Sequence, residues 1–261
     1  MREALGISRQ IWAISSVTFH ELLREKILWS AFVFAVLCVG LAFAASQLAF
    51  ADNARVALDF GLTSVSIIGG MISIIMGAAL IAKEVQNRTL YLVLTKAIWR
   101  WQFVLGRFMG LLAILILNSL LMTAVVIVVV KMAGGSLDSS FAKSIILQIV
   151  EFGVLAAMAS IFSAFSTSTL AAIFASGIWV IGHAMTDLRL LSQKIEPPTM
   201  RPVLGAITSI LPDLTRFDIK AEVSHNLPVT WTFTGVSVAY GIAYILFALV
   251  VSCLIFQRRD L

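Results

Sequence analysis

Long apolar runs separated by short polar stretches dominate this chain. A helix needs roughly 20 apolar residues to cross a bilayer, and six stretches of the chain have about that length. The pattern therefore predicts an all-α polytopic membrane protein with six transmembrane helices. These spans are expected at about residues 27–50, 60–82, 103–130, 142–165, 168–189 and 231–256.

An amphipathic helix is expected before the first span. Within residues 1–26 the apolar side chains fall on one arc of a helical wheel, with Arg9, His20 and Arg24 opposite. A helix of this kind lies in the membrane interface. We therefore expect residues 1–26 to form a cytoplasmic or interfacial helix and residues 27–261 to form the transmembrane domain. A plain cytoplasmic extension of the first span is the alternative.

The basic residues predict the orientation of the chain. Four precede the first span, five lie between residues 83 and 107, and two follow the last span, whereas the short loops on the opposite side hold Arg55, Lys131 and Lys143. Cytoplasmic loops carry an excess of Lys and Arg, so both termini are predicted to be cytoplasmic. The long outer loop, residues 190–230, does not change this orientation, because long loops cross the membrane largely regardless of charge.

The composition excludes a soluble globular domain. The chain is 60% hydrophobic and 13% charged, with a mean hydropathy of +0.98, against about 45–50% and about 25% in soluble domains. Its net charge of +5 comes from residues at the ends of apolar runs. We therefore expect membrane lipid rather than nucleic acid as a partner. The two cysteines, Cys38 and Cys253, lie inside apolar runs and indicate neither a disulfide framework nor a metal site.

The charged stretch between the second and third spans is the main candidate for an interaction surface. Within residues 84–101, Leu90 and Leu94 share one side of a predicted helix, and Arg88 and Arg100 lie elsewhere on it. The spacing predicts a short amphipathic cytoplasmic helix that another protein can bind. Ordinary snorkelling of basic side chains at the membrane interface is the alternative.

A polar cluster is predicted inside the membrane. An ionised carboxylate in a span costs on the order of 2.5–3.5 kcal/mol, and Glu151 lies inside the fourth span on the same helical face as Gln148. A tight hairpin between the fourth and fifth spans brings Glu151 level with His183, and Asp187 follows one turn later. The cluster either faces a translocation path or is a hydrogen-bonded staple or a neutral glutamate. Its loose spacing does not indicate a metal site.

The chain contains none of the common catalytic motifs. Neither G-x-S-x-G, H-E-x-x-H nor the phosphate-binding G-x-x-x-x-G-K-S/T occurs. We therefore assign no catalytic residue and expect no ATP hydrolysis by this chain alone.

The charged stretch resembles a pattern of ABC-2 type permeases, the membrane subunits of ABC exporters. That pattern reads E-x-x-x-G-T-L-x-x-L-L-x-x-P-I-x-R-x-x-x-x-x-G-K. This chain departs from it at Arg88, where the family usually has Gly, at Ala97, where it often has Pro, and at Arg107, which replaces Lys. The matching positions are Glu84, Thr89, Leu90, Leu92 to Leu94, Ile98 to Arg100, Phe103 and Leu105 to Gly106. The six spans, Leu211 to Leu214 and the closing residues extend the resemblance, which is strongest to permeases linked to multicopper enzyme maturation.

The resemblance implies different roles for different parts of the chain and a separate ATPase partner. Residues 1–26 would be the connecting helix, and residues 84–101 the coupling helix that docks on a separate ATP-binding cassette ATPase. It implies no cofactor in this chain, ATP and Mg on the ATPase, a second permease copy in a homodimer, and a prokaryotic cell (inner) membrane. The residues expected to act in coupling are Glu84, Arg88, Thr89, Arg100 and Arg107.

Other functions stay open on the sequence alone. A secondary transporter or channel would use Glu151 and His183 as a proton relay, and an internal repeat would be expected. No convincing repeat relates residues 27–130 to residues 142–256, which argues against this alternative. A membrane anchor that recruits a soluble protein is a further alternative. The pattern does not specify a substrate.

Overall fold

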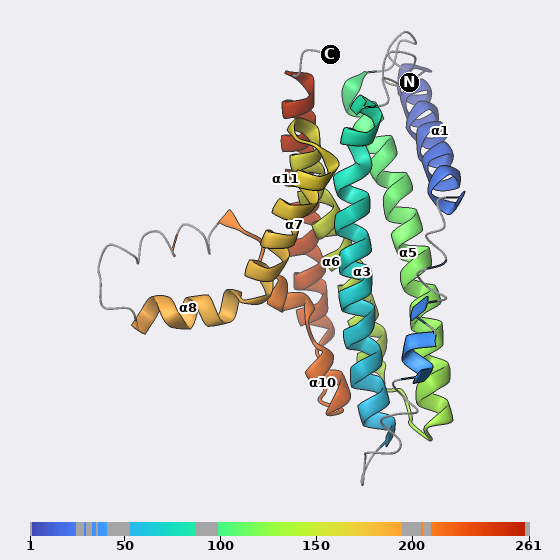
Figure 1. Ribbon diagram of the computed structural model, residues 1–261, viewed down its shortest axis with the longest axis vertical. Coiled ribbons are helices and arrows are strands. Elements are labelled where there is room, and N and C mark those ends of the chain that lie inside the picture. The colour runs from blue at the N-terminus through green and yellow to red at the C-terminus, as the bar shows by residue number, and fades with distance from the viewer. Residues whose placement is uncertain are drawn as a thin grey trace.

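Long helices make up the part of the chain that the computed structural model describes (Figure 1). The described residues are 2–24, 29, 33–34, 36–40, 53–86, 99–194, 205 and 210–258, and they contain no strand. Four of these helices are long and apolar enough to cross a membrane, which confirms the prediction of an all-α, multi-pass membrane protein. They are α3 (Asn53–Gln86), α5 (Arg100–Met132), α6 (Ser139–Phe165) and α11 (Trp231–Gln257).

The four long helices correspond to the second, third, fourth and sixth predicted spans. Most of the first predicted span, residues 27–50, lies outside the described residues. The start of α1 (Arg2–Arg24) and the end of α11 lie at the same end of the bundle in Figure 1. This agrees with an even number of crossings, and the cytoplasmic location of that end stays a prediction.

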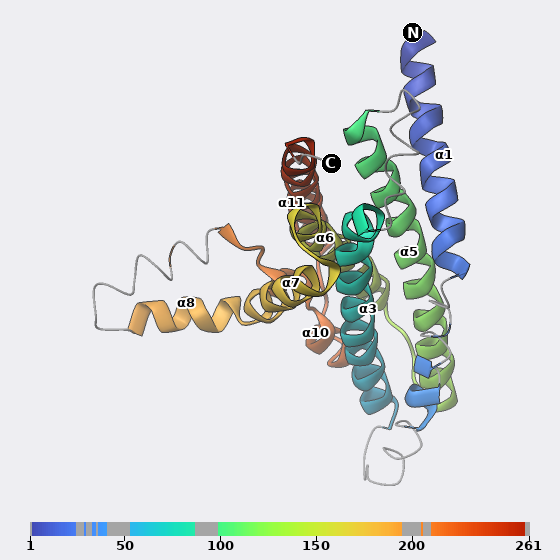
Figure 2. The same cartoon turned by 45° about the horizontal axis from the view of Figure 1, so that its top comes forward.

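The fifth predicted span, residues 168–189, ends earlier than expected. The helix α7 (Ser168–His183) stops after 16 residues, and α8 (Met185–Lys194) then leaves the bundle sideways in both views (Figures 1 and 2). A helix of this length extends about 24 Å, which is less than the roughly 30 Å of the hydrocarbon core. The prediction was wrong at this outer end because Thr186, Asp187 and Arg189 are exposed polar residues of α8 rather than part of a span.

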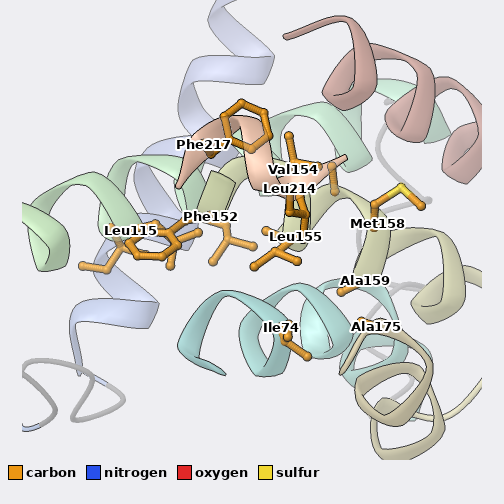
Figure 3. Packing of buried hydrophobic residues seen from close by; sticks show 14 of the residues in the cluster. Ile74, Leu115, Phe152, Val154, Leu155, Met158, Ala159, Ala175, Leu214 and Phe217 are labelled. Atoms are coloured by element: carbon orange, nitrogen blue, oxygen red, sulfur yellow. The ribbon is translucent and has the colours of Figure 1, made fainter. Parts of the chain in front are cut away.

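The helix α6 occupies the centre of the bundle. It packs against α3, α5, α7 and α11. It also packs against two short elements of residues 210–230, which we call the outer segment: η1 (Leu214–Phe217) and α10 (Lys220–Ser224). Figure 3 shows Phe152, Leu155 and Met158 of α6 among side chains from these neighbours. Any displacement of α6 therefore changes contacts with nearly every other described helix.

Small residues spaced four apart form packing seams between the helices. A Cβ atom on Gly77 of α3 would lie 2.6 Å from the carbonyl oxygen of Ala156 on α6. On α5, a Cβ on Gly110 would lie 2.6 Å from the carbonyl oxygen of Ser15 on α1. Such seams let helix backbones approach closely in lipid.

The amphipathic helix α1 lies lengthwise beside the first half of α5 (Figure 1). Its Thr18 and Leu22 are buried, whereas Trp12 and Val17 are exposed. One side of the helix is therefore covered by protein, and the exposed side also carries apolar residues. Its position in the membrane interface stays a prediction.

A tight turn joins α6 to α7. Only Ser166 and Thr167 separate the two helices, and the Thr167 hydroxyl oxygen accepts a hydrogen bond from the backbone N–H of Leu170 at 3.4 Å. This N-cap confirms the hairpin that the sequence predicted between the fourth and fifth spans. The turn fixes the relative height of side chains on the two helices.

Candidate functional site

The predicted coupling helix, residues 84–101, is bounded differently in the structure. Glu84 belongs to the last turn of α3, and Arg100 is the first residue of α5. Arg88 and Thr89 lie outside the described residues, as does the side chain of Glu84. Both ends of this stretch are thus continuous with long helices, and we call residues 84–101 the coupling segment.

Arg100 joins the start of α5 to the end of α11. Its Nη1 atom donates hydrogen bonds to the carbonyl oxygens of Phe256 at 3.2 Å and Gln257 at 3.0 Å. The guanidinium also lies 5.9 Å from the centroid of the Phe256 ring. The last carbonyls of a helix lack partners within the helix, so Arg100 caps α11. The start of α5 and the end of α11 are thereby held together.

Arg107 joins α5 to α1. Its Nη1 atom lies 2.8 Å from Oε2 of Glu21, and its guanidinium lies 5.5 Å from the centroid of the Phe103 ring. The side chain of Arg107 is only 15% exposed. Arg100 and Arg107, the two arginines of the predicted coupling residues that the structure describes, therefore have partners within the chain. They hold the first half of α5 against α11 and α1.

Gln102 is a residue of this end that the sequence analysis missed. It is buried, and its Oε1 atom accepts a hydrogen bond from the backbone N–H of Trp99 at 3.0 Å. This is one half of a capping box, in which a Glu or Gln three residues into the helix bonds back to the N-cap residue. The spacing Trp99-x-x-Gln102 was the available signal, although Trp is not a usual N-cap residue.

The structure brings Glu151, at the middle of α6, together with His183, at the end of the shorter helix α7. Oε1 of Glu151 lies 3.4 Å from Nε2 of His183, and the Glu151 side chain is 1% exposed. The imidazole ring meets the Trp179 indole edge to face, with 5.9 Å between ring centroids. The hairpin turn produces this contact because it sets the two helices in a fixed register.

Gln148 lies about one turn before Glu151 on the same face of α6. Its amide nitrogen donates to the carbonyl oxygen of Leu62 on α3 at 3.0 Å, which links α6 to the outer part of α3. Asp187 does not join Glu151 and His183, because it lies on α8, beyond the break at Ala184, and is exposed. Among the described residues, no group of three or more His, Cys, Asp or Glu side chains is arranged to hold a metal ion.

Asp213 is the centre of a second polar network that the sequence analysis did not identify. Its carboxylate lies 2.8 Å from Nη1 of Arg189 and 3.8 Å from Nε of Arg216, and it accepts a hydrogen bond from the Thr215 hydroxyl at 2.6 Å. Its backbone N–H donates to the Tyr240 hydroxyl oxygen at 2.9 Å. We call these five residues the Asp213 network, which ties α8 and η1 to α11.

Lys143 fastens the outer segment at a second point. Its buried ammonium group donates to the carbonyl oxygen of Val229 at 2.6 Å and lies 5.0 Å from the Trp231 ring centroid. The sequence placed Lys143 on the outer side, but it gave no sign of these partners. The start of α6 is thus attached to the start of α11.

The arrangement defines a polytopic membrane protein in which a short folded segment joins one end of α6, α7 and α11. A model of the family described as ABC-2 family transporter protein matches residues 12–261. The chain belongs to this family, and it is a membrane permease subunit of an ABC transporter, a class that works with an ATP-binding cassette subunit. No curated protein matches the chain significantly.

Proposed function

We propose that the chain is an exporter subunit driven by a separate ATPase that docks on the coupling segment. The observation that carries this proposal is the pair of hydrogen bonds from Arg100 to the end of α11. A push on the coupling segment reaches α3 and α5 directly, because both helices continue into it. Through Arg100 the same push also reaches α11.

The proposed mechanism is alternating access. ATP-driven closure of the ATPase moves the coupling segment, and the tips of α5 and α11 move as a unit. Glu21 and Arg107 carry α1 along with α5. At the far end, α11 is fastened to the outer segment through Tyr240, so displacement of α11 changes the outer closure. ATP and Mg belong to the ATPase in this proposal.

The complete transporter is proposed to be a homodimer of this permease with two ATPases, in the inner membrane of a prokaryotic cell. Support comes from the apolar outer faces of α7 and α11, which lipid or a second copy can cover. Their exposed residues include Ile173, Phe174, Val180, Leu246, Phe247, Val250 and Leu254. A role in multicopper enzyme maturation is the finer proposal for its physiological context.

Purification from native membranes tests the proposal. The detergent-solubilised protein should bring down a protein with a phosphate-binding loop, and the complex should hydrolyse ATP. Glu84→Ala combined with Arg100→Ala should release this ATPase or uncouple its activity from the permease. Arg24→Ala is the matched control, because Arg24 is an exposed arginine at the end of α1.

The outcomes separate the competing functions. An associated ATPase that is lost or uncoupled in the double variant supports the proposed role of the coupling segment. If no ATPase accompanies the wild type and substrate still moves, the proposal fails and the proton-relay transporter of Glu151 and His183 replaces it. Co-purification with a protein that lacks ATPase activity would instead indicate a membrane anchor.

A further inference from the structure

Unsatisfied polar atoms occur along the face of α6 that carries Glu151. Among the described residues, six buried side-chain nitrogen or oxygen atoms have no hydrogen-bond partner; three of them lie on this face of α6, and a fourth belongs to Trp179, whose ring contacts that of His183. Buried polar atoms are normally paired with protein or with ordered water, so this group marks a polar site rather than ordinary packing. The four atoms are Ser144 Oγ, Gln148 Oε1, Glu151 Oε1 and Trp179 Nε1.

The tautomer of His183 follows from its neighbours. Its Nδ1 atom lies 3.1 Å from the carbonyl oxygen of Trp179, and a carbonyl oxygen can only accept. Nδ1 therefore carries the hydrogen. In a neutral imidazole the other nitrogen is then a bare acceptor, and here that nitrogen, Nε2, faces the Glu151 carboxyl group.

An ionised Glu151 beside a neutral His183 would set two acceptors against each other. Oε1 and Nε2 are 3.4 Å apart, and Glu151 is almost fully buried. Leaving a buried charge without a donor is costly. One additional proton removes the conflict wherever it resides, because either O–H donates to Nε2 or N–H donates to the carboxylate.

The charged residues that act on this pair come from the outer segment. Lys220 and Asp218 interact electrostatically with both Glu151 and His183, and they lie 3.3 Å from each other. As a close ion pair they largely offset one another. The indole nitrogen of Trp179 lies beside the carboxyl group without hydrogen-bond geometry.

The other neighbouring helices contribute polar but no further charged partners among the described contacts. From α3 comes the Leu62 carbonyl, which Gln148 occupies. From α11 comes Tyr240, which bonds to the outer segment at Asp213. The outer segment closes over the site, since Leu214 packs against Gly182, the residue before His183.

We propose that Glu151 and His183 form a buried hydrated site that holds one proton between Oε1 and Nε2 at neutral pH. The folded protein then keeps a proton that the unfolded chain has released to solvent. Because the folded state binds more protons, its stability falls as pH rises. The ratio of folded to unfolded protein should fall by up to about tenfold per pH unit above neutrality.

Thermal unfolding of the full-length protein in detergent, measured from neutral to mildly alkaline pH, tests this site. Glu151→Gln supplies an amide N–H that donates to Nε2 at every pH, so this variant should lose the pH-dependent fall that the wild type shows. Glu222→Gln is the matched control on the same outer side, and it should keep the wild-type fall. Equal pH dependence in the wild type and Glu151→Gln would overturn the proposal.

A spectroscopic measurement decides the matter even if a variant does not fold. At neutral pH the wild type should show either the infrared carbonyl stretch of a protonated carboxyl group or the ¹⁵N signal of a doubly protonated imidazole. Labelling of His183 alone, with the other two histidines replaced, assigns the ¹⁵N signal to this residue. An ionised Glu151 beside a singly protonated His183 would contradict the proposal.

Discussion

The helices α6 and α11 are both strongly apolar, yet the structure uses them differently. In the most apolar window of α6, 67% of the residues are buried, against 22% in α11. The buried face of α6 carries small and polar residues such as Ser160, Ser163 and Gln148. The outward face of α11 carries bulky ones, among them Leu246 and Phe247.

The difference shows that average apolar character does not identify the centre of a membrane bundle. Lipid is as apolar as a leucine side chain, so helices associate in it through close packing and hydrogen bonds. Small residues and buried hydroxyl groups therefore mark α6 as central. Changes at the α6 interface should cost more than equivalent changes on α11.

The largest effect is expected for Gly77→Ala, at the seam between α3 and α6. The added methyl group would lie 2.6 Å from the Ala156 carbonyl oxygen and 2.8 Å from its Cα, and backbone atoms cannot rotate away. We expect a loss of about 1–3 kcal/mol from overpacking, measured by unfolding in detergent. Gly235→Ala on α11 meets nothing within 4 Å and should be neutral or slightly stabilising. Equal losses would remove the distinction between the two helices.

Ser163→Ala should follow in size. The Ser163 hydroxyl donates to the Ala78 carbonyl at 2.7 Å and accepts from the backbone N–H groups of Ile81 and Ala82 at 3.1 and 2.9 Å. Its removal takes away these three buried hydrogen bonds between α6 and α3, at a cost of about 1–3 kcal/mol in unfolding free energy.

The matched change on α11 is Ser252→Ala. Its hydroxyl donates a hydrogen bond of 3.1 Å to the Ser160 carbonyl, and single bonds of this kind in membrane bundles average about 0.6 kcal/mol. A larger loss for Ser252→Ala than for Ser163→Ala would contradict the central role of α6.

Asp213→Ala should have a smaller and more local effect, because it loosens the attachment of α11 to the outer segment. Its partners Arg189 and Arg216 are 47% and 44% exposed and remain hydrated when the carboxylate is removed. We expect about 1 kcal/mol of global destabilisation. The variant should raise the rate of amide hydrogen exchange much more in α8 than in α6. An equal rise in both helices would contradict this expectation.

The smallest loss of stability is expected for Arg100→Ala. It removes the cap of α11 at a partly exposed tip, worth below about 1 kcal/mol, while coupled ATP hydrolysis should fall strongly. Arg258→Ala, an exposed change at the same tip, should leave both the stability and the coupled hydrolysis near wild type. A fall in stability without a loss of coupling would limit Arg100 to a structural role.

Features set by short sequence distances were predictable. The long spans follow from apolar length, and the Gly77 seam follows from spacing along one helix. The contact of Glu151 with His183 follows from a two-residue turn and the constant rise of a helix. In each case the positions that matter are related by regular helical geometry.

Features that join distant residues were not predictable. The break after His183 is stabilised by Leu214 against Gly182 and by the bond of Arg189 to Asp213, and no helical period relates these positions. Arg100 was expected to act in the coupling segment. Its bond to Phe256 was not expected, because that partner is 156 residues away along the chain. Side-chain pairing of this kind depends on how the helices assemble.

Photo-crosslinking from position 89 tests the docking of an ATPase on the coupling segment most directly. A crosslinker replacing Thr89 in the full-length protein, in native membranes, should capture a protein that mass spectrometry identifies by its ATP-binding cassette sequence. The same crosslinker at position 235 of α11 should not capture it. If position 89 fails to capture an ATPase that co-purifies with the permease, the coupling segment is not its docking site and the account is wrong on this point.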